Sequence, residues 1–255
     1  SCGYKGNLFT LVRDLKGWDT ATIFSYIKKD EAVTPDVLES RFKDLPQYVV
    51  PADPIGMSEA RLAVFHDVPD IELENRYITR EAADYLGIKW APKTYSWILP
   101  IRDPDDGSLW GWQEKGANGR FFKNQPAGVK KSKTVFGVQQ QSKEATVVVE
   151  SPLDVVRLGS ISNIKGVATF GCAITKEQFN VIRGAKRVLF ALDNDDAGNM
   201  SAIEVKKWAD AHNKPIWFFN YDTTDQKDVG GMSKQEIQYG IENARLSLRK
   251  GELAK

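Results

Sequence analysis

Acidic residues follow two apolar, β-branched runs of the sequence, and this arrangement restricts the fold more than any other feature. Glu150 comes directly after the run at 145–149, and Asp193 and Asp195 follow the run at 188–192. In a parallel α/β sheet, the residues after such strands lie side by side at one edge, where ligands bind. Carboxylates held together repel one another unless a hard cation binds them, and oxygen ligands favour Mg²⁺ or Mn²⁺. The sequence therefore predicts a divalent metal site and metal-assisted phosphoryl chemistry.

Some acids near these strands have a structural explanation. An Asp after a strand is often a helix cap or a turn residue. Asp196 fits that role best because it stands directly before a helix-like run. We predict Glu150, Asp193 and Asp195 as ligands. Asp228, in a later Lys-Asp-Val-Gly-Gly segment, is a further candidate ligand, and Asp154 is expected to support the site from nearby.

Several motifs surround these acids. They are Glu150-x-x-x-Asp154, Gly171-Cys172-Ala173-Ile174-Thr175 and Asp193-Asn194-Asp195-Asp196-Ala197-Gly198, with Leu99-Pro100-Ile101, Gly111-Trp112-Gln113-Glu114-Lys115, Asn124-Gln125-Pro126 and 131–137 in the preceding half. Their order and spacing resemble those of the Toprim-containing replicative primases of bacteria and phages. The resemblance runs from about Tyr77 to Asp228 and implies the RNA polymerase core of a primase, with Gly198 in a supporting role.

The sequence departs from the family pattern at informative positions. Ser151 replaces the Gly that usually follows the Glu, and Lys115 takes the place of an Arg. Phe121 stands where a Lys is usual. The segment 227–229, Lys-Asp-Val, replaces an Asp-Pro-Asp.

Basic residues are concentrated between Lys115 and Lys143, where no Asp or Glu occurs. The seven are Lys115, Arg120, Lys123, Lys130, Lys131, Lys133 and Lys143. Such a run can be a solvated face, but interspersed glycines and nearby aromatic residues favour nucleic-acid binding. Lys115, Asn124 and Lys131, which match family positions, are expected to bind phosphates or template, while Arg120, Lys123, Lys130 and Lys133 add general attraction.

Composition restricts the class of protein. The 35 Lys plus Arg residues and 34 Asp plus Glu residues give a net charge of +1, so any nucleic-acid surface must come from local segregation of charge. Two cysteines in 255 residues argue against a disulfide framework. No apolar run approaches the length of a signal peptide or membrane span. We expect a cytoplasmic protein of a bacterial cell or of a phage that infects it, with no membrane partner.

The expected fold class is α/β, an α+β subdomain followed by a Toprim-like parallel-sheet subdomain. The expected divisions are 1–17, the tail of a zinc ribbon with a linker helix; 18–92, mainly helical; 93–143, basic and β-rich; 144–230, the Toprim domain; and 231–255, a C-terminal helix, expected from Ser233 to about Lys250. Within these, a helix is expected from Thr79 to Leu86, antiparallel strands at 95–102, 109–114 and 120–123, and a capping box at Thr175 and Gln178.

The resemblance implies primer RNA synthesis on single-stranded DNA from ribonucleoside triphosphates, with two Mg²⁺ or Mn²⁺ ions and a replicative helicase in cis or in trans as partner. Zinc is expected only in a ribbon that precedes residue 1, because Cys2 alone cannot form a four-ligand site. A metal-dependent Toprim nuclease and a non-catalytic single-stranded-DNA-binding module remain alternatives. A topoisomerase would need a gate domain with a catalytic Tyr, for which the chain leaves little room.

Overall fold

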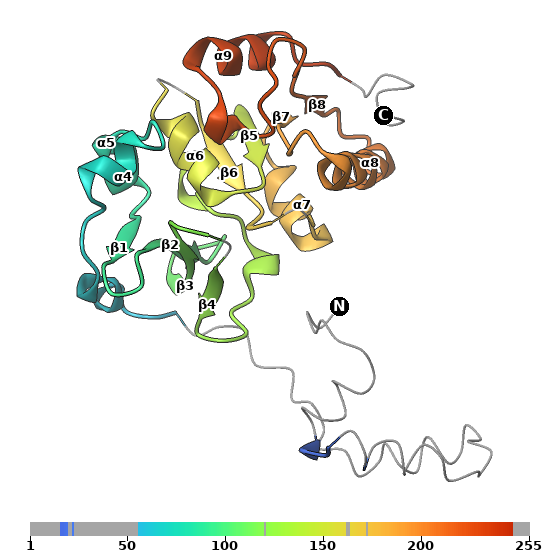
Figure 1. Ribbon diagram of the computed structural model, residues 1–255. Coiled ribbons are helices and arrows are strands. Elements are labelled where there is room, and N and C mark those ends of the chain that lie inside the picture. The colour runs from blue at the N-terminus through green and yellow to red at the C-terminus, as the bar shows by residue number, and fades with distance from the viewer. Residues whose placement is uncertain are drawn as a thin grey trace, which may run out of the picture. The chain divides into compact units, whose positions relative to one another are not determined.

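The computed structural model describes residues 16–19, 22, 56–119, 121–161, 164–171 and 173–246 (Figure 1). The chain divides into two compact units, 1–50 and 51–255, and every element below belongs to the second. In chain order these elements are η1 (Glu59–Val64), α4 (Asp70–Glu74), α5 (Arg80–Tyr85), β1 (Lys89–Ala91), β2 (Ser96–Arg102), β3 (Leu109–Gly116), β4 (Phe122–Gln125), η2 (Lys131–Lys133), η3 (Val138–Gln140), β5 (Ala145–Val149), α6 (Pro152–Gly159), β6 (Gly166–Ala168), α7 (Lys176–Ile182), β7 (Arg187–Phe190), α8 (Asp196–Ala211), β8 (Trp217–Phe218), η4 (Val229–Gly231) and α9 (Lys234–Glu242).

The first sheet is antiparallel, with the strand order β1-β2-β3-β4. The 103–108 turn joins β2 to β3, and Gly107 adopts a positive φ of 75° there, which costs glycine little. Gly111 lets β4 approach closely, because a Cβ at this position would lie 2.1 Å from the Gln125 carbonyl oxygen. These contacts bring the basic segment after β3 back along the sheet.

The second sheet is parallel, with the order β6-β5-β7-β8. Val148 of β5 pairs with Phe190 of β7, and Val149 pairs with Ala168 of β6. Because neighbouring strands run in the same direction, the residues that follow β5 and β7 emerge at the same edge. This register places both acidic segments together.

Helices cover both faces of the parallel sheet, which explains its nearly uninterrupted apolar strands. Val147 and Val149 pack in a core shared with α6 and with β2 of the first sheet. Val148 and Phe190 face the other way, into a core formed with α7 and α8. The antiparallel sheet and α6 thus contribute to one continuous core. This shared core holds the antiparallel sheet, with its basic residues, beside the acidic edge, which is the edge of the parallel sheet where the acidic segments emerge.

The expected fold class is confirmed: the protein combines an antiparallel sheet with a parallel, helix-covered sheet. Thr79 caps α5, and Thr175 and Gln178 form the expected capping box of α7. Strand β1 was not expected within the 18–92 part. Its three residues are too few to show a periodic pattern, and Trp90 owes its burial to edge-on packing against Tyr95 and Trp97.

Two local expectations were wrong. The C-terminal helix ends at Glu242, because Arg245 already pairs with Phe218 through reciprocal backbone hydrogen bonds of 2.8 and 2.9 Å. Asp195, and not Asp196, caps α8. Arg120, Cys172 and residues 1–15 of the expected 1–17 segment lie outside the described residues. Among the helices that the structure describes, none is both long and apolar enough to cross a membrane.

Candidate metal centre

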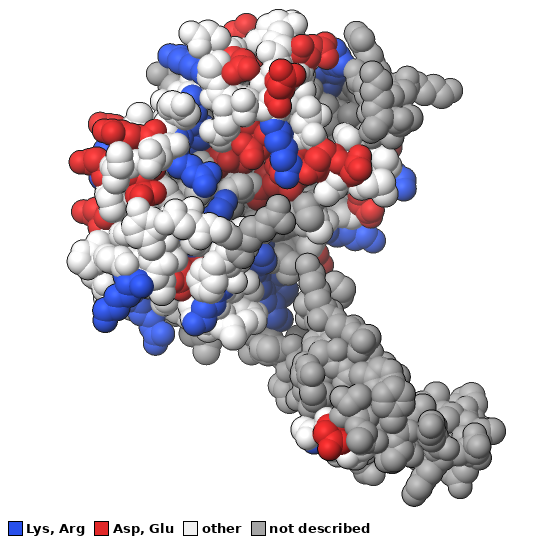
Figure 2. All heavy atoms as spheres, in the orientation of Figure 1, with Lys and Arg blue, Asp and Glu red and all other residues white. Residues whose placement is uncertain are grey.

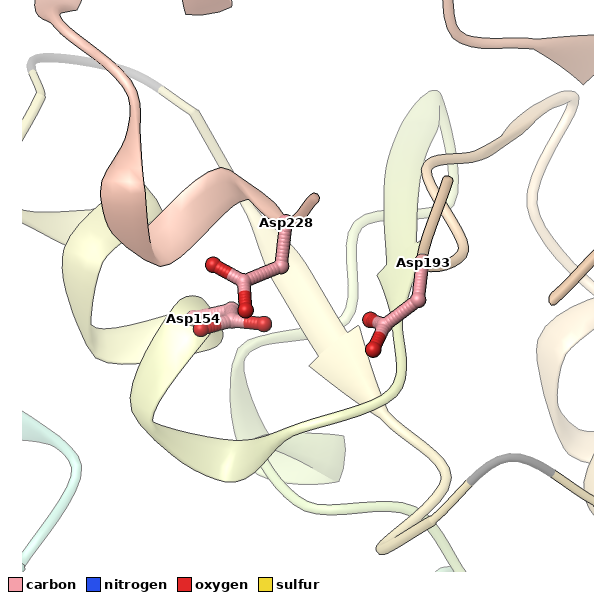
Figure 3. Close-up of side chains that lie close together, drawn as sticks. All are labelled: Asp154, Asp193 and Asp228. Atoms are coloured by element: carbon pink, nitrogen blue, oxygen red, sulfur yellow. The ribbon is translucent and has the colours of Figure 1, made fainter. Parts of the chain in front are cut away.

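Three aspartates from separate segments meet at the carboxyl edge of the parallel sheet. Asp154 lies in the first turn of α6, Asp193 follows β7, and Asp228 directly precedes η4. One carboxylate oxygen from each lies within 4.8 Å of the others, and the three side chains point toward a common centre (Figure 3). This triad is a candidate metal centre.

The turn from β7 into α8 depends on a glycine. A Cβ on Gly198 would lie 1.9 Å from the backbone oxygen of Asp193, so no other residue permits this approach without movement. The Gly198 amide also donates to Asp195 Oδ1 at 2.9 Å, which caps the helix. Below this turn, the Tyr221 hydroxyl donates to the Leu192 carbonyl at 2.5 Å. These contacts hold Asp193 at the end of its strand.

A second glycine shapes the opposite side of the triad. The Asp228 carboxylate caps η4 by accepting from the Gly231 amide at 3.1 Å. A Cβ on Gly230 would lie 2.7 Å from Asp154 Oδ1. The backbone of η4 therefore packs directly against the Asp154 carboxylate, and any larger residue at 230 would push on the triad.

Burial and mutual repulsion make this edge unfavourable for negative charge. Glu150 is buried, and its Oε1 accepts from the Asp193 amide at 3.2 Å. Burial, with the Asp193 charge, raises the pKa of Glu150 to about 7. Burial, with the Asp228 charge, raises the pKa of Asp154 to about 8. A bound cation would relieve both effects.

The oxygen-only donor set fits a hard divalent ion. Oxygens around an octahedral Mg²⁺ at about 2.1 Å are roughly 3–4 Å apart, so the 4.8 Å span of the triad closes with a small movement. Two of the three aspartates keep partial exposure, which leaves room for water or substrate oxygens. Asp154, Asp193 and Asp228 could therefore hold Mg²⁺ or Mn²⁺.

The predicted ligands divide into two groups. Asp193 and Asp228 are in the triad, together with Asp154, which was expected only to support it. Glu150 lies beneath Asp193 and contacts its backbone. Asp195 uses one oxygen to cap α8 and the other to bind Lys227 at 2.9 Å. Their roles as ligands stay predictions.

Lys115 extends from β3 to the same edge. Its Nζ donates to Ser151 Oγ at 3.2 Å and lies 5.6 Å from the centre of the Phe122 ring. Burial lowers the pKa of Lys115, while the nearby Asp154 carboxylate opposes that shift. The serine that replaces the family's glycine thus positions a cation beside the triad.

The other predicted nucleic-acid residues follow Lys115 along the chain. Lys123 and Asn124 lie on β4, and Lys130, Lys131 and Lys133 lie in or next to η2. Lys131 Nζ donates to the Phe170 carbonyl at 3.0 Å, which ties η2 to the loop after β6. Figure 2 shows acidic side chains gathered near the centre of one face, with basic side chains beside them.

A cavity of about 520 Å³ opens beside the triad, and its lining includes Asp228, Arg76, Tyr77, Asn118 and Gln226. Arg76 carries no distinguishing sequence pattern, because it is a lone Arg in a helix-like acidic segment. Tyr221 was also missed. Burial raises its pKa, and the neighbouring Asp193 contributes to the shift, so it too lies close to the acids.

Comparisons with known proteins agree with this geometry. Residues 147–230 match a family described as Toprim-like, so the acidic edge belongs to a Toprim-like domain. The chain is 24% identical over 259 aligned positions to the DNA primase of Halalkalibacterium halodurans, in a match covering 77% of this chain and 42% of that protein. It therefore spans less than half the length of this curated relative.

Solved structures place the fold more specifically. The DnaG primase catalytic domain bound to single-stranded DNA is 19% identical, with a TM-score of 0.61 over 73% of this chain and 77% of that one. The primase fragment of the bacteriophage T7 primase-helicase protein is 17% identical, with a TM-score of 0.55 over 74% and 82%. The chain has the fold of a DnaG-type primase catalytic core, and the resemblance found in its motifs is confirmed.

Proposed function

We propose that this protein is a DNA primase that makes RNA primers on single-stranded DNA. The observation that carries the proposal is the triad of Asp154, Asp193 and Asp228 at the edge of a Toprim-like domain, within the fold of a primase catalytic core. Its substrates would be ribonucleoside triphosphates and a DNA template, and a replicative helicase would be its partner. The phage T7 relative, named as a primase-helicase protein, supports that last point.

The complete reaction would use two divalent ions, one held by the triad and one arriving on the phosphates of the nucleotide. When bound, such ions neutralise the triphosphate and lower the pKa of the attacking 3′-hydroxyl. Glu150, whose Oε1 accepts from the Asp193 amide at 3.2 Å, would hold the residue after β7 in place beside the ions. Asp154, Asp193 and Asp228 would hold the first of these ions.

The basic groups near the triad would position the nucleotide and the template. Lys115 is held by Ser151 beside Asp154, where its charge can meet a phosphate. Arg76 lies in the cavity next to Asp228 and offers a planar, bidentate phosphate donor. Lys123, Asn124 and Lys131 would contact the template, whose phosphates fix position without specifying sequence.

One assay tests this function. The protein is incubated with labelled ribonucleotides, a single-stranded DNA of mixed sequence, and Mg²⁺ or Mn²⁺. The proposal predicts short RNA products that require the template and the divalent ion. Shortening of the DNA without RNA synthesis would instead identify a Toprim nuclease, and binding without either product would identify a non-catalytic module.

A further inference from the structure

The ammonium group of Lys227 lies between two carboxylates of the acidic edge. The Nζ atom of Lys227 lies 3.0 Å from Asp193 Oδ2 and 2.9 Å from Asp195 Oδ2. A single ammonium group thus joins two carboxylates that were both expected to bind metal.

The backbone fixes this placement. The Asn194 amide donates to the Lys227 carbonyl at 2.7 Å, so the segment before η4 is tied to the turn between Asp193 and Asp195. Asp228 turns from the same segment toward Asp154. The adjacent residues Lys227 and Asp228 therefore lie on two sides of the acidic edge. The Asp228 carboxylate belongs to the triad, and the Lys227 ammonium group binds Asp195.

Asp193 is shared by both sides. One oxygen of each triad carboxylate can serve a single ion, while Asp193 Oδ2 and Asp195 Oδ2 bind the Lys227 ammonium. A second ion bound between Asp193 and Asp195 would have to displace that ammonium group. It would otherwise face a like charge at close range, with no free oxygen on Asp195, whose Oδ1 caps α8.

We propose that the Lys227 ammonium group occupies the position between Asp193 and Asp195 where a second divalent ion would otherwise bind. The protein without nucleotide then binds one divalent ion, at Asp154, Asp193 and Asp228. The proposal rests on the proposed metal-dependent function of the same edge. The Lys227 side chain is 58% exposed, so it can move away when a nucleotide arrives with its own ion. Lys227 would thereby limit premature loading of the second position.

Counting bound ions tests the proposal without measuring catalysis. Mn²⁺ is titrated into the metal-free protein at neutral pH, and free Mn²⁺ is followed by electron paramagnetic resonance. We expect one ion on the natural chain and two on Lys227→Met, which keeps the length of the side chain and removes its charge. We expect Lys227→Arg to bind one ion, because it restores the charge. On the natural chain the second ion should bind at least about thirtyfold more weakly than on Lys227→Met, because a divalent ion would lie a few ångströms from a unit positive charge.

Two further variants separate the possible failures. Lys186→Met is the matched control, because it removes a lysine whose Nζ lies 2.9 Å from the Glu144 carboxylate. This pair lies at the start of the parallel strands and thus at the opposite edge of the sheet. The Lys186→Met variant should bind one ion. Asp154→Asn should lose the triad ion. Equal stoichiometry for the natural chain and Lys227→Met, with the ion lost in Asp154→Asn, would overturn the role of Lys227 and leave the metal centre standing. Unchanged binding in Asp154→Asn would overturn both.

Discussion

Replacing Asp154 by Asn should make the metal-free protein more stable and remove its response to metal. The carboxyl of Asp154 is buried beside Asp228, and its pKa of about 8 compares with 3.8 in the absence of these effects. Folding near neutral pH must therefore neutralise a group that is ionised in the unfolded chain. Asn has almost the same shape and carries no charge, so it avoids that cost.

The size of the gain follows from linkage. At pH 7 the rise in pKa from 3.8 to about 8 corresponds to at most about 4 kcal/mol. Relaxation and water penetration reduce such penalties, and the loss of an acid from the first turn of α6 costs about 0.3–1 kcal/mol. We expect the free energy of unfolding to rise by about 1–3 kcal/mol in chelator. The natural chain should gain about 2.7 kcal/mol from Mg²⁺ at 100 times its dissociation constant, and Asp154→Asn should gain almost none.

Urea denaturation of both proteins in chelator and in Mg²⁺ measures these four free energies. Asp210→Asn serves as the control. It removes an exposed acid from α8 that pairs with Lys206 at 2.5 Å, and it should change stability by less than about 0.5 kcal/mol and keep the metal response. A metal-free Asp154→Asn protein that is less stable than the natural chain, yet fully stabilised by Mg²⁺, would refute the electrostatic description of the triad.

Three further outcomes follow from the same geometry. Because the folded-state pKa values of Glu150 and Asp154 are raised, the metal-free protein should lose stability as pH increases from about 4 to about 8. Mg²⁺ should therefore stabilise the protein far more near pH 8 than near pH 5, and urea titrations at both pH values would show this difference. Gly198→Ala should displace the Asp193 backbone and weaken Mn²⁺ binding, measured by calorimetry, at least about tenfold. An unchanged affinity would mean that the Asp193 backbone is not displaced. Replacing Lys123 and Lys130 by Ala should reduce the log–log salt dependence of single-strand binding by about 1.4, and an unchanged slope in fluorescence anisotropy would mean that neither contacts phosphate.

Much of the fold could be predicted because its patterns are local. The apolar runs before Glu150 and Asp193 indicate buried parallel strands, and a parallel register brings the ends of such strands to one edge. Capping residues such as Thr79 and Thr175 define helix starts from spacing alone. Strand β1 could not be predicted in this way, because its order depends on contacts with residues that lie later in the chain.

The composition of the site was harder to predict. Asp154, in the first turn of α6, was expected only to support the site, yet it lies in the triad, where the backbone of η4 at Gly230 packs against its carboxylate. Asp195 resembles a ligand in the motif, but the helix N-terminus and Lys227 use its two oxygens. Such choices depend on which distant segments pack together, and one sequence carries no direct record of that packing.

We propose that nucleotide addition depends on the ion held by the triad. The most direct measurement is extension of a short RNA annealed to single-stranded DNA, in Mg²⁺ or Mn²⁺, by the natural chain, Asp193→Asn and the control Asp210→Asn. We predict that the natural chain and the control add ribonucleotides, and that Asp193→Asn, with its fold intact by circular dichroism, is slower by at least about a thousandfold. Extension by Asp193→Asn at a rate comparable to that of the natural chain would show that nucleotide addition does not depend on an ion held by the triad.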